Sequence, residues 1–321
     1  MQIIWVPFTD MSTSSLHIVE LQLTVQGTNN IWMSESWYVQ CAFWLCLYNR
    51  QWHKPNVSCL WNNECTRDSR FYPARSFGGH KKLKSDLSSG PDGLPPLLYK
   101  RVKDSLAYPL ALMFTQLFSV GIVPYEWKNA IVTPIFEKGL AGNVSNYLPV
   151  SLTCASSKLM ERIISAAIYR HLLGNMLLSS THHGFIKGKS TCTNLVEDVS
   201  DWTLAVQNRC GINVAYIYFS KAFDTVSYEK LFHCLYSYGI RDDLLRWLKN
   251  FLTGRSQQTR VGMALSELID LLSGVIQGSS IGPVLFLIYL DGLAKLLEHH
   301  GITANLFADD VKMYMVIEND L

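Results

Sequence analysis

Two adjacent carboxylates, Asp309 and Asp310, interrupt an otherwise apolar stretch of the chain. The flanking runs, residues 304–307 and 311–316, each have the length and composition of a short strand, so the sequence predicts a tight hairpin with the acids at its tip. Neighbouring carboxylates repel each other and are costly to desolvate unless cations share them. Pairs of divalent metals bound in this way drive phosphoryl and nucleotidyl transfer. A solvated Asp-Asp turn is the structural alternative, and the surrounding motifs must decide between the two.

Bulk composition sets the class of protein. The 321 residues are 48% hydrophobic and 12% aromatic, which suits one large globular domain or two to three smaller ones. No apolar run reaches the roughly 18 residues of a membrane span, and the N-terminus lacks the order of a signal peptide. The eight cysteines include no CxxC pair. The usual spacing of zinc ligands is matched poorly by Cys41, Cys46, Cys59, Cys65 and His53. The sequence therefore predicts scattered thiols in a reducing compartment rather than a zinc site.

The net charge of +2 hides a division along the chain. Residues 81–190 carry thirteen basic and six acidic groups, residues 191–321 carry ten and fifteen, and the remainder is balanced. A basic segment followed by an acidic one fits a protein that binds a polyanionic backbone with one part and metal ions with another. Chance surface charge would give the same numbers, so this feature only supports the motifs.

The first quarter of the chain differs from the rest. Residues 1–78 hold six of the nine tryptophans and show no sustained period, which predicts an irregular leader without recognisable chemistry. Further on, periodicity predicts strands at 130–136 and 214–219, and helices at 97–119, 159–172, 231–238, 244–252 and 283–297. The clearest of these helices, 159–172, has an apolar face with charged residues expected on its opposite side, namely Lys158, Glu161, Arg162 and Arg170.

Six short motifs follow one another along the chain. They are residues 90–93 (GPDG), 151–164 (SLTCASSKLMERII), 184–191 (GFIKGKST), 219–226 (FSKAFDTV), 273–286 (SGVIQGSSIGPVLF) and 307–310 (FADD). In this order they resemble the reverse transcriptase domain of a non-LTR (LINE-type, jockey-like) retrotransposon, over about residues 81–321. Group II intron maturases and telomerase share an Ala-Asp-Asp hairpin, but the SKAFD and QGS segments fit the LINE-type group better.

The resemblance implies an α+β right-hand polymerase with fingers and palm, in which helices pack on an antiparallel palm sheet and the thumb is missing. Residues 1–78 would be an unmatched leader, residues 79–200 the basic fingers, and residues 201–321 a palm that is truncated after the FADD hairpin. The family activity is RNA-directed DNA polymerisation by nucleotidyl transfer, with an RNA template, a DNA primer and deoxynucleoside triphosphates as partners. No membrane partner is implied, and localisation would be nuclear or cytoplasmic.

The same resemblance assigns roles at the catalytic corner. Asp309 would be a metal ligand and Asp310 its acidic neighbour. Two Mg²⁺ ions would activate the primer 3′-hydroxyl and neutralise the triphosphate. Phe223 matches the aromatic gate that excludes a ribose 2′-hydroxyl, with ordinary core packing as its structural alternative.

Other residues would contact nucleotide and nucleic acid. Gln277 and Gly278 match the glycine-rich segment that lines the nascent base pair, where a missing side chain permits close approach, although turn chemistry alone could explain them. Lys138 would lie near the triphosphate. The resemblance places Lys187, Lys189 and Ser190 in the fingers, in contact with nucleic acid.

This chain also departs from the family pattern. Tyr218 stands where the family has its strand aspartate, and a neutral phenol with a pKa of about 10 is a poor Mg²⁺ ligand. Asp224 lies six residues further on, roughly 20 Å along a strand or 9 Å along a helix, too far to substitute. Leu148 stands where the family usually has an arginine expected to touch the triphosphate, and its loss should weaken nucleotide binding. Ile186 and Ile276 replace other usual residues with milder effects. We therefore expect little or no activity, with a non-catalytic nucleic-acid-binding remnant or an unstable pseudogene product as alternatives.

Overall fold

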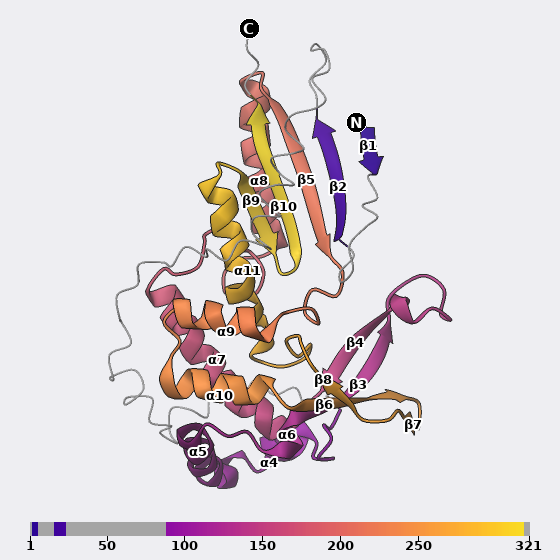
Figure 1. Cartoon of the computed structure of the whole chain (residues 1–321), viewed down its shortest axis with the longest axis vertical. Coiled ribbons are helices and arrows are strands. Elements are labelled where there is room, and N and C mark those ends of the chain that lie inside the picture. The colour runs from indigo at the N-terminus through magenta and orange to yellow at the C-terminus, as the bar shows by residue number, and fades with distance from the viewer. Residues whose placement is uncertain (1, 6–15, 24–87, 318–321) are drawn as a thin grey trace. The chain divides into compact units, whose positions relative to one another are not determined.

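The computed structural model describes residues 2–5, 16–23 and 88–317 (Figure 1). The chain divides into two compact units that alternate along the sequence. Unit 1 takes residues 1–54, 176–225 and 286–321, and unit 2 takes residues 55–175 and 226–285. Most of the predicted leader, including the four cysteines considered above for zinc, lies outside the described residues.

Unit 1 is built on an antiparallel sheet with the strand order β1-β2-β5-β10-β9. Its strands are β1 (Gln2–Trp5), β2 (Leu16–Leu23), β5 (Gly211–Phe219), β9 (Thr303–Phe307) and β10 (Asp310–Ile317). The predicted hairpin is confirmed: β9 and β10 pair from Phe307 and Asp310 outward, joined by the two-residue turn Ala308-Asp309. β10 also pairs with β5, and this register sets Asp310 directly opposite Tyr218.

Among the described residues of unit 1, helix α8 (Thr191–Gln207) and most of α11 (Gly282–His299) accompany this sheet. Ala205 of α8 packs in a buried cluster with three side chains of the sheet, which are Ile212, Val214 and Tyr314. Helix α8 was not predicted, because its apolar residues face the wrong way for a core pattern. Its Leu195, Val196 and Val199 are more than half exposed, whereas Asp198 is fully buried.

Unit 2 contains a second sheet with the order β4-β3-β6-β7, in which β8 also pairs with β6. The strands are β3 (Asn129–Phe136), β4 (Tyr147–Leu152), β6 (Arg255–Val261), β7 (Ala264–Leu265) and β8 (Ile269–Leu271). β3 and β6 run parallel, and the other pairs are antiparallel. Only β3 was predicted, because β6 is polar and β7 and β8 are too short to show a period.

Unit 2 also contains the following helices among its described residues. They are α4 (Pro96–Arg101), α5 (Lys103–Val120), α6 (Tyr125–Lys128), the 3-10 turn η2 (Val144–Asn146), α7 (Ala155–Gly174), α9 (Tyr228–Ser237) and α10 (Asp242–Leu252). The predicted helix 97–119 is thus two helices that meet at Val102. Helix α7 buries its apolar face as expected, but it also buries Glu161, so our placement of this residue on the outer side was wrong. Within the described ranges, no helix is long and apolar enough to cross a membrane.

Candidate active site

The acidic corner of unit 1 is formed by the β9–β10 turn. Ala308 takes the left-handed conformation, with φ 57°, which closes the two-residue turn and places Asp309 at its end. Asp310 is exposed at the first position of β10, and Tyr218, 47% exposed, lies across from it on β5. The two carboxylates and the phenol therefore lie at the same end of the sheet.

The electrostatics of this corner are unfavourable for two anions. Desolvation raises the pKa of Asp310, and repulsion from the neighbouring Asp309 raises it further. A raised carboxyl pKa means that the ionised form is destabilised where it lies. A bound cation would relieve this repulsion, which is the behaviour expected of a metal-binding carboxylate pair.

The donor set at the corner nevertheless does not fit a two-metal centre. In the described part of the chain, no group of three or more His, Cys, Asp or Glu side chains is arranged to hold a metal ion. Asp224 lies in the turn after β5, where desolvation raises its pKa against the attraction of Lys221, and it joins no such group. Mg²⁺ prefers carboxylate and water oxygens in strict octahedral geometry, and Tyr218 offers neither at the third position.

A short segment before α8 supports the hairpin. The His183 N–H donates to the Leu306 carbonyl at 2.7 Å, and the Leu306 N–H donates to the Thr181 carbonyl at 3.0 Å. Gly184 then passes so close to the turn that an added Cβ would lie 2.2 Å from the Ala308 nitrogen. The first glycine of the GFIKGKST motif is therefore required by packing against the acidic corner, a role that the sequence did not reveal.

Phe223 lies in an aromatic stack within unit 1. Its ring stacks on Phe286 with centroids 4.4 Å apart, and Phe185 meets it edge-on at 6.1 Å. Phe223 is thus packed against other aromatic side chains, as its structural alternative of core packing predicts. Its role as a gate for the sugar remains a prediction.

The basic residues predicted to touch nucleic acid lie at the start of α8. Ser190 caps this helix, accepting the Thr193 N–H at 3.3 Å, while Thr193 Oγ1 accepts the Ser190 N–H at 2.8 Å. Lys189 donates to the Ser180 carbonyl, and Lys187 is exposed. The Ser190 hydroxyl therefore has a structural partner, and Lys187 is the more accessible of the two cations.

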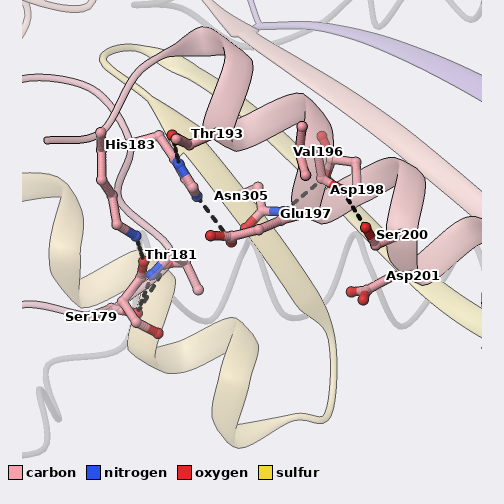
Figure 2. A network of polar contacts seen from close by, with 12 residues as sticks. Ser179, Thr181, His183, Thr193, Val196, Glu197, Asp198, Ser200, Asp201 and Asn305 are labelled. Atoms are coloured by element: carbon pink, nitrogen blue, oxygen red, sulfur yellow. Dashed lines mark hydrogen bonds and ion pairs between the residues drawn. The ribbon is translucent and has the colours of Figure 1, made fainter.

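Polar side chains also join α8 to the β9–β10 hairpin (Figure 2). Asp198 of α8 is fully buried and accepts a hydrogen bond from Asn305 Nδ2 of β9 at 2.8 Å. It also pairs with Lys312 of β10, which is only 8% exposed and lies over the rings of Trp202 and Tyr216. One buried carboxylate thus connects both strands that carry the acidic turn.

A second part of this network centres on His183, whose side chain is buried. Its Nε2 lies 3.1 Å from the Glu197 carboxylate, and its Nδ1 lies 2.9 Å from Thr193 Oγ1 (Figure 2). Desolvation lowers the pKa of His183, assisted by Lys189, and the attraction of Glu197 opposes that shift. This position therefore favours the neutral imidazole more than an exposed position would.

A hollow of about 230 Å³ lies beside the acidic corner, between the first turn of α8 and the sheet. Two tyrosines, the second carboxylate, the buried lysine and two polar residues of α8 contribute to its lining, namely Tyr216, Tyr218, Asp310, Lys312, Thr191 and Asn194. The corner is thus accessible from one side and offers both aromatic and charged surface to a ligand.

The remaining predicted site residues belong to unit 2. The Gln277 carbonyl accepts the Ser151 N–H at 2.8 Å, which ties the glycine-rich loop to β4. Gly278 has φ 111°, and an added Cβ would lie 2.6 Å from the Ser151 carbonyl oxygen, so this position requires glycine. Lys138 is exposed in the loop that follows β3. Ser151 and the glycine-rich loop thus lie in direct contact.

Comparison with known proteins adds the family. Residues 137–321 match the family described as reverse transcriptase (RNA-dependent DNA polymerase). The chain is 28% identical to the probable RNA-directed DNA polymerase from transposon BS of Drosophila melanogaster, over 65% of its length. It is 27% identical over 65% to the RNA-directed DNA polymerase from mobile element jockey of the same species, and 26% identical over 72% to the Pol polyprotein from type-1 retrotransposable element R2 of Popillia japonica. These matches cover 23%, 23% and 33% of the respective relatives.

Proposed function

Since this chain belongs to the reverse transcriptase family, as the reverse transcriptase domain of a non-LTR retrotransposon, we propose that it retains the polymerase fold and has lost most of its catalytic activity. Its mixed helices and strands, with an antiparallel sheet, fit a polymerase palm. We assign the sheet of unit 1 to the palm and the basic residues 79–200 to the fingers. RNA template, DNA primer and deoxynucleoside triphosphates are the proposed partners.

The observation that carries the loss of activity is the pairing of Tyr218 with Asp310. Reverse transcriptases generally use divalent metal ions. In this chain the position facing the acidic turn offers a phenol instead of a carboxylate. Catalytic groups tolerate errors of about half an ångström, and a misplacement of about 1 Å costs on the order of a hundredfold in rate. Loss of an entire ligand should cost at least that much.

Binding of nucleic acid does not depend on the missing carboxylate. Residues 81–190 retain an excess of seven positive charges, and the exposed Lys138 and Lys187 belong to this segment. Phosphate contacts of this kind dominate affinity and weaken steeply with salt. We therefore propose binding of an RNA–DNA hybrid that survives chelation of metal ions and declines as the salt concentration rises. A remnant with this property alone is the second candidate function.

Primer extension on an RNA template in the presence of Mg²⁺ tests the proposal. We expect the unaltered chain to show almost no incorporation, and Tyr218→Asp to raise the rate by about a hundredfold or more. Tyr218→Phe is the matched control, because it removes the hydroxyl without supplying a carboxylate, and it should remain inactive. Clear incorporation by the unaltered chain would refute the proposed loss of activity.

A further inference from the structure

Glu161, in the first half of α7, is a fully buried carboxylate to which no motif assigns a role. Its Oε2 accepts the backbone N–H of Ser280 at 2.7 Å, 119 residues away in the sequence. Its Oε1 accepts the hydroxyl of Ser157 at 2.8 Å, one helical turn earlier. Each oxygen therefore has a partner, and one of these partners is the backbone of the glycine-rich loop.

Nearby cations make a charged Glu161 tolerable at this buried position. Burial lowers the pKa of Arg255, Lys158 and Arg162, and in each case the attraction of Glu161 opposes the shift. Arg255 is itself fixed, since it donates to the carbonyls of Phe251 and Trp127 at 2.9 Å. The Ser280 N–H therefore donates to a carboxylate that lies in a positive environment. Hydrogen bonds to a charged acceptor of this kind are stronger than those between neutral groups.

The loop that Glu161 holds contains Gln277 and Gly278. β4 holds one end of it, through the bond from Ser151 to the Gln277 carbonyl. At the other end, Ser279 Oγ accepts the N–H groups of Ile281 and Gly282 at 3.0 Å, where α11 begins. Ser280 lies between these anchors, and the hydrogen bond from its N–H to Glu161 fixes the centre of the loop to α7.

The loop turns two residues outward. Ile276 and Ser279 are buried, whereas Gly278 is exposed and Gln277 is partly exposed. Three separate anchors thus determine how the outward pair is presented, and only the one from Glu161 is a charged side chain. A substitution of Glu161 would therefore change the position and orientation of Gln277 and Gly278, although Glu161 contacts the loop only through the backbone of Ser280.

We propose that Glu161 is a positioning residue, which holds the glycine-rich loop in the position where Gln277 and Gly278 contact the base pair at the primer end. This inference rests on the proposed function, because Gln277 and Gly278 contact a nascent pair only if the chain binds an RNA–DNA hybrid. The carboxylate acts through the backbone of Ser280 and does not itself reach the ligand.

Hydrogen–deuterium exchange on the full chain tests the positioning. In Glu161→Ala, the amides of residues 276–282 should exchange about ten- to a hundredfold faster, as expected for loss of one charge-assisted hydrogen bond. Glu161→Gln keeps an acceptor oxygen and should show a smaller increase, and the exposed Glu267→Ala should show none. Unchanged exchange in the loop of Glu161→Ala would overturn the proposal. Should that variant fail to fold, Glu161→Gln decides by the same comparison with Glu267→Gln.

Binding of a fluorescein-labelled RNA–DNA hybrid with a recessed primer end, followed by anisotropy, tests the consequence. Glu161→Ala should bind this end about tenfold more weakly and Glu161→Gln should recover most of the affinity, while a blunt hybrid distinguishes the primer-end contact from general phosphate binding. Wild-type affinity in a variant whose loop exchanges faster would show a merely structural role and overturn the inference. Absence of hybrid binding by the unaltered chain would instead refute the proposed function, a result that the loop exchange alone could not produce.

Discussion

Removing the carboxylate of Asp198 should destabilise unit 1 strongly, because it leaves the buried ammonium group of Lys312 without its anionic partner. Lys312 is only 8% exposed and pairs with Asp198, which has no exposed surface at all. Asn305 donates to the same carboxylate and would lose its acceptor. Asp198→Ala thus breaks an ion pair from one side only, which is the costly way to break it.

The size of the effect can be bounded. Breaking a buried pair from one side typically costs about 3–5 kcal/mol, and the orphaned amide of Asn305 adds about 1 kcal/mol or more. The lysine can escape part of this cost by losing its proton, which at pH 7 limits the charge penalty to about 4.6 kcal/mol for a normal pKa of about 10.4. At pH 9 the same limit falls to about 1.9 kcal/mol. We therefore expect a loss of about 3–5 kcal/mol at pH 7 that shrinks as the pH rises.

The sign follows from proton binding. In Asp198→Ala the folded chain lowers the pKa of Lys312, so the unfolded chain binds more protons below about pH 10, and the stability of the variant rises with pH. Native-state hydrogen exchange of the α8 and β10 amides measures the opening free energy of unit 1 at each pH. Asp198→Leu combined with Lys312→Met removes both charges and should recover most of the loss.

The exposed pair Asp243–Arg246 on α10 supplies the control. Its N···O distance is 2.8 Å, but both side chains are about half exposed, so Asp243→Ala should cost less than about 1 kcal/mol. A loss below about 1 kcal/mol in Asp198→Ala, or a loss that does not depend on pH between 7 and 9, would refute the reasoning. Either result would mean that Lys312 finds solvent or another anion without disturbing the strands.

Two further predictions concern the support of the acidic corner. Because the folded state lowers the pKa of His183, the unfolded chain binds the additional proton, so the stability of unit 1 should fall as the pH drops below about 6.5. When unfolding by urea is measured at several pH values, the free energy of unfolding of His183→Gln should change less between pH 6.5 and 5 than that of the unaltered chain. An equal change in the two proteins would contradict this prediction. Gly184→Ala forces a Cβ to within 2.2 Å of the Ala308 nitrogen, and by overpacking it should destabilise unit 1 by about 1–3 kcal/mol. Gly142→Ala, which meets nothing within 4 Å, should be close to neutral in the same urea unfolding assay.

The elements that sequence alone could predict are those whose apolar residues face inward. Helix α7 was visible because Met160, Ile168 and Leu172 follow a helical period and are fully buried. The hairpin was visible because turn residues separate two apolar runs. Pairing registers were not accessible, so the sequence could name Tyr218 as the replaced position but could not show that it faces Asp310.

The elements that were missed have polar interiors. Helix α8 buries Asp198 and exposes Val196 and Val199, the reverse of the pattern that predicts a helix. Glu161 was placed on the outer side of α7 because a charged residue is rarely buried without partners, and two of its partners, Ser280 and Arg255, come from segments distant in the sequence. Buried ionic contacts of this kind are tertiary information, and a single sequence does not encode them in its period.

Tyr218 has a thermodynamic consequence that is separate from chemistry. A carboxylate at position 218 would face Asp310, with Asp309 next to it, and would crowd three negative charges at one end of the sheet, an arrangement that opposes folding in the absence of cations. The uncharged ring of Tyr218 adds no such repulsion, so unit 1 needs less charge compensation by cations to fold than it would with a carboxylate there. Tyr218→Asp should therefore make the folding of unit 1 depend more strongly on divalent ions.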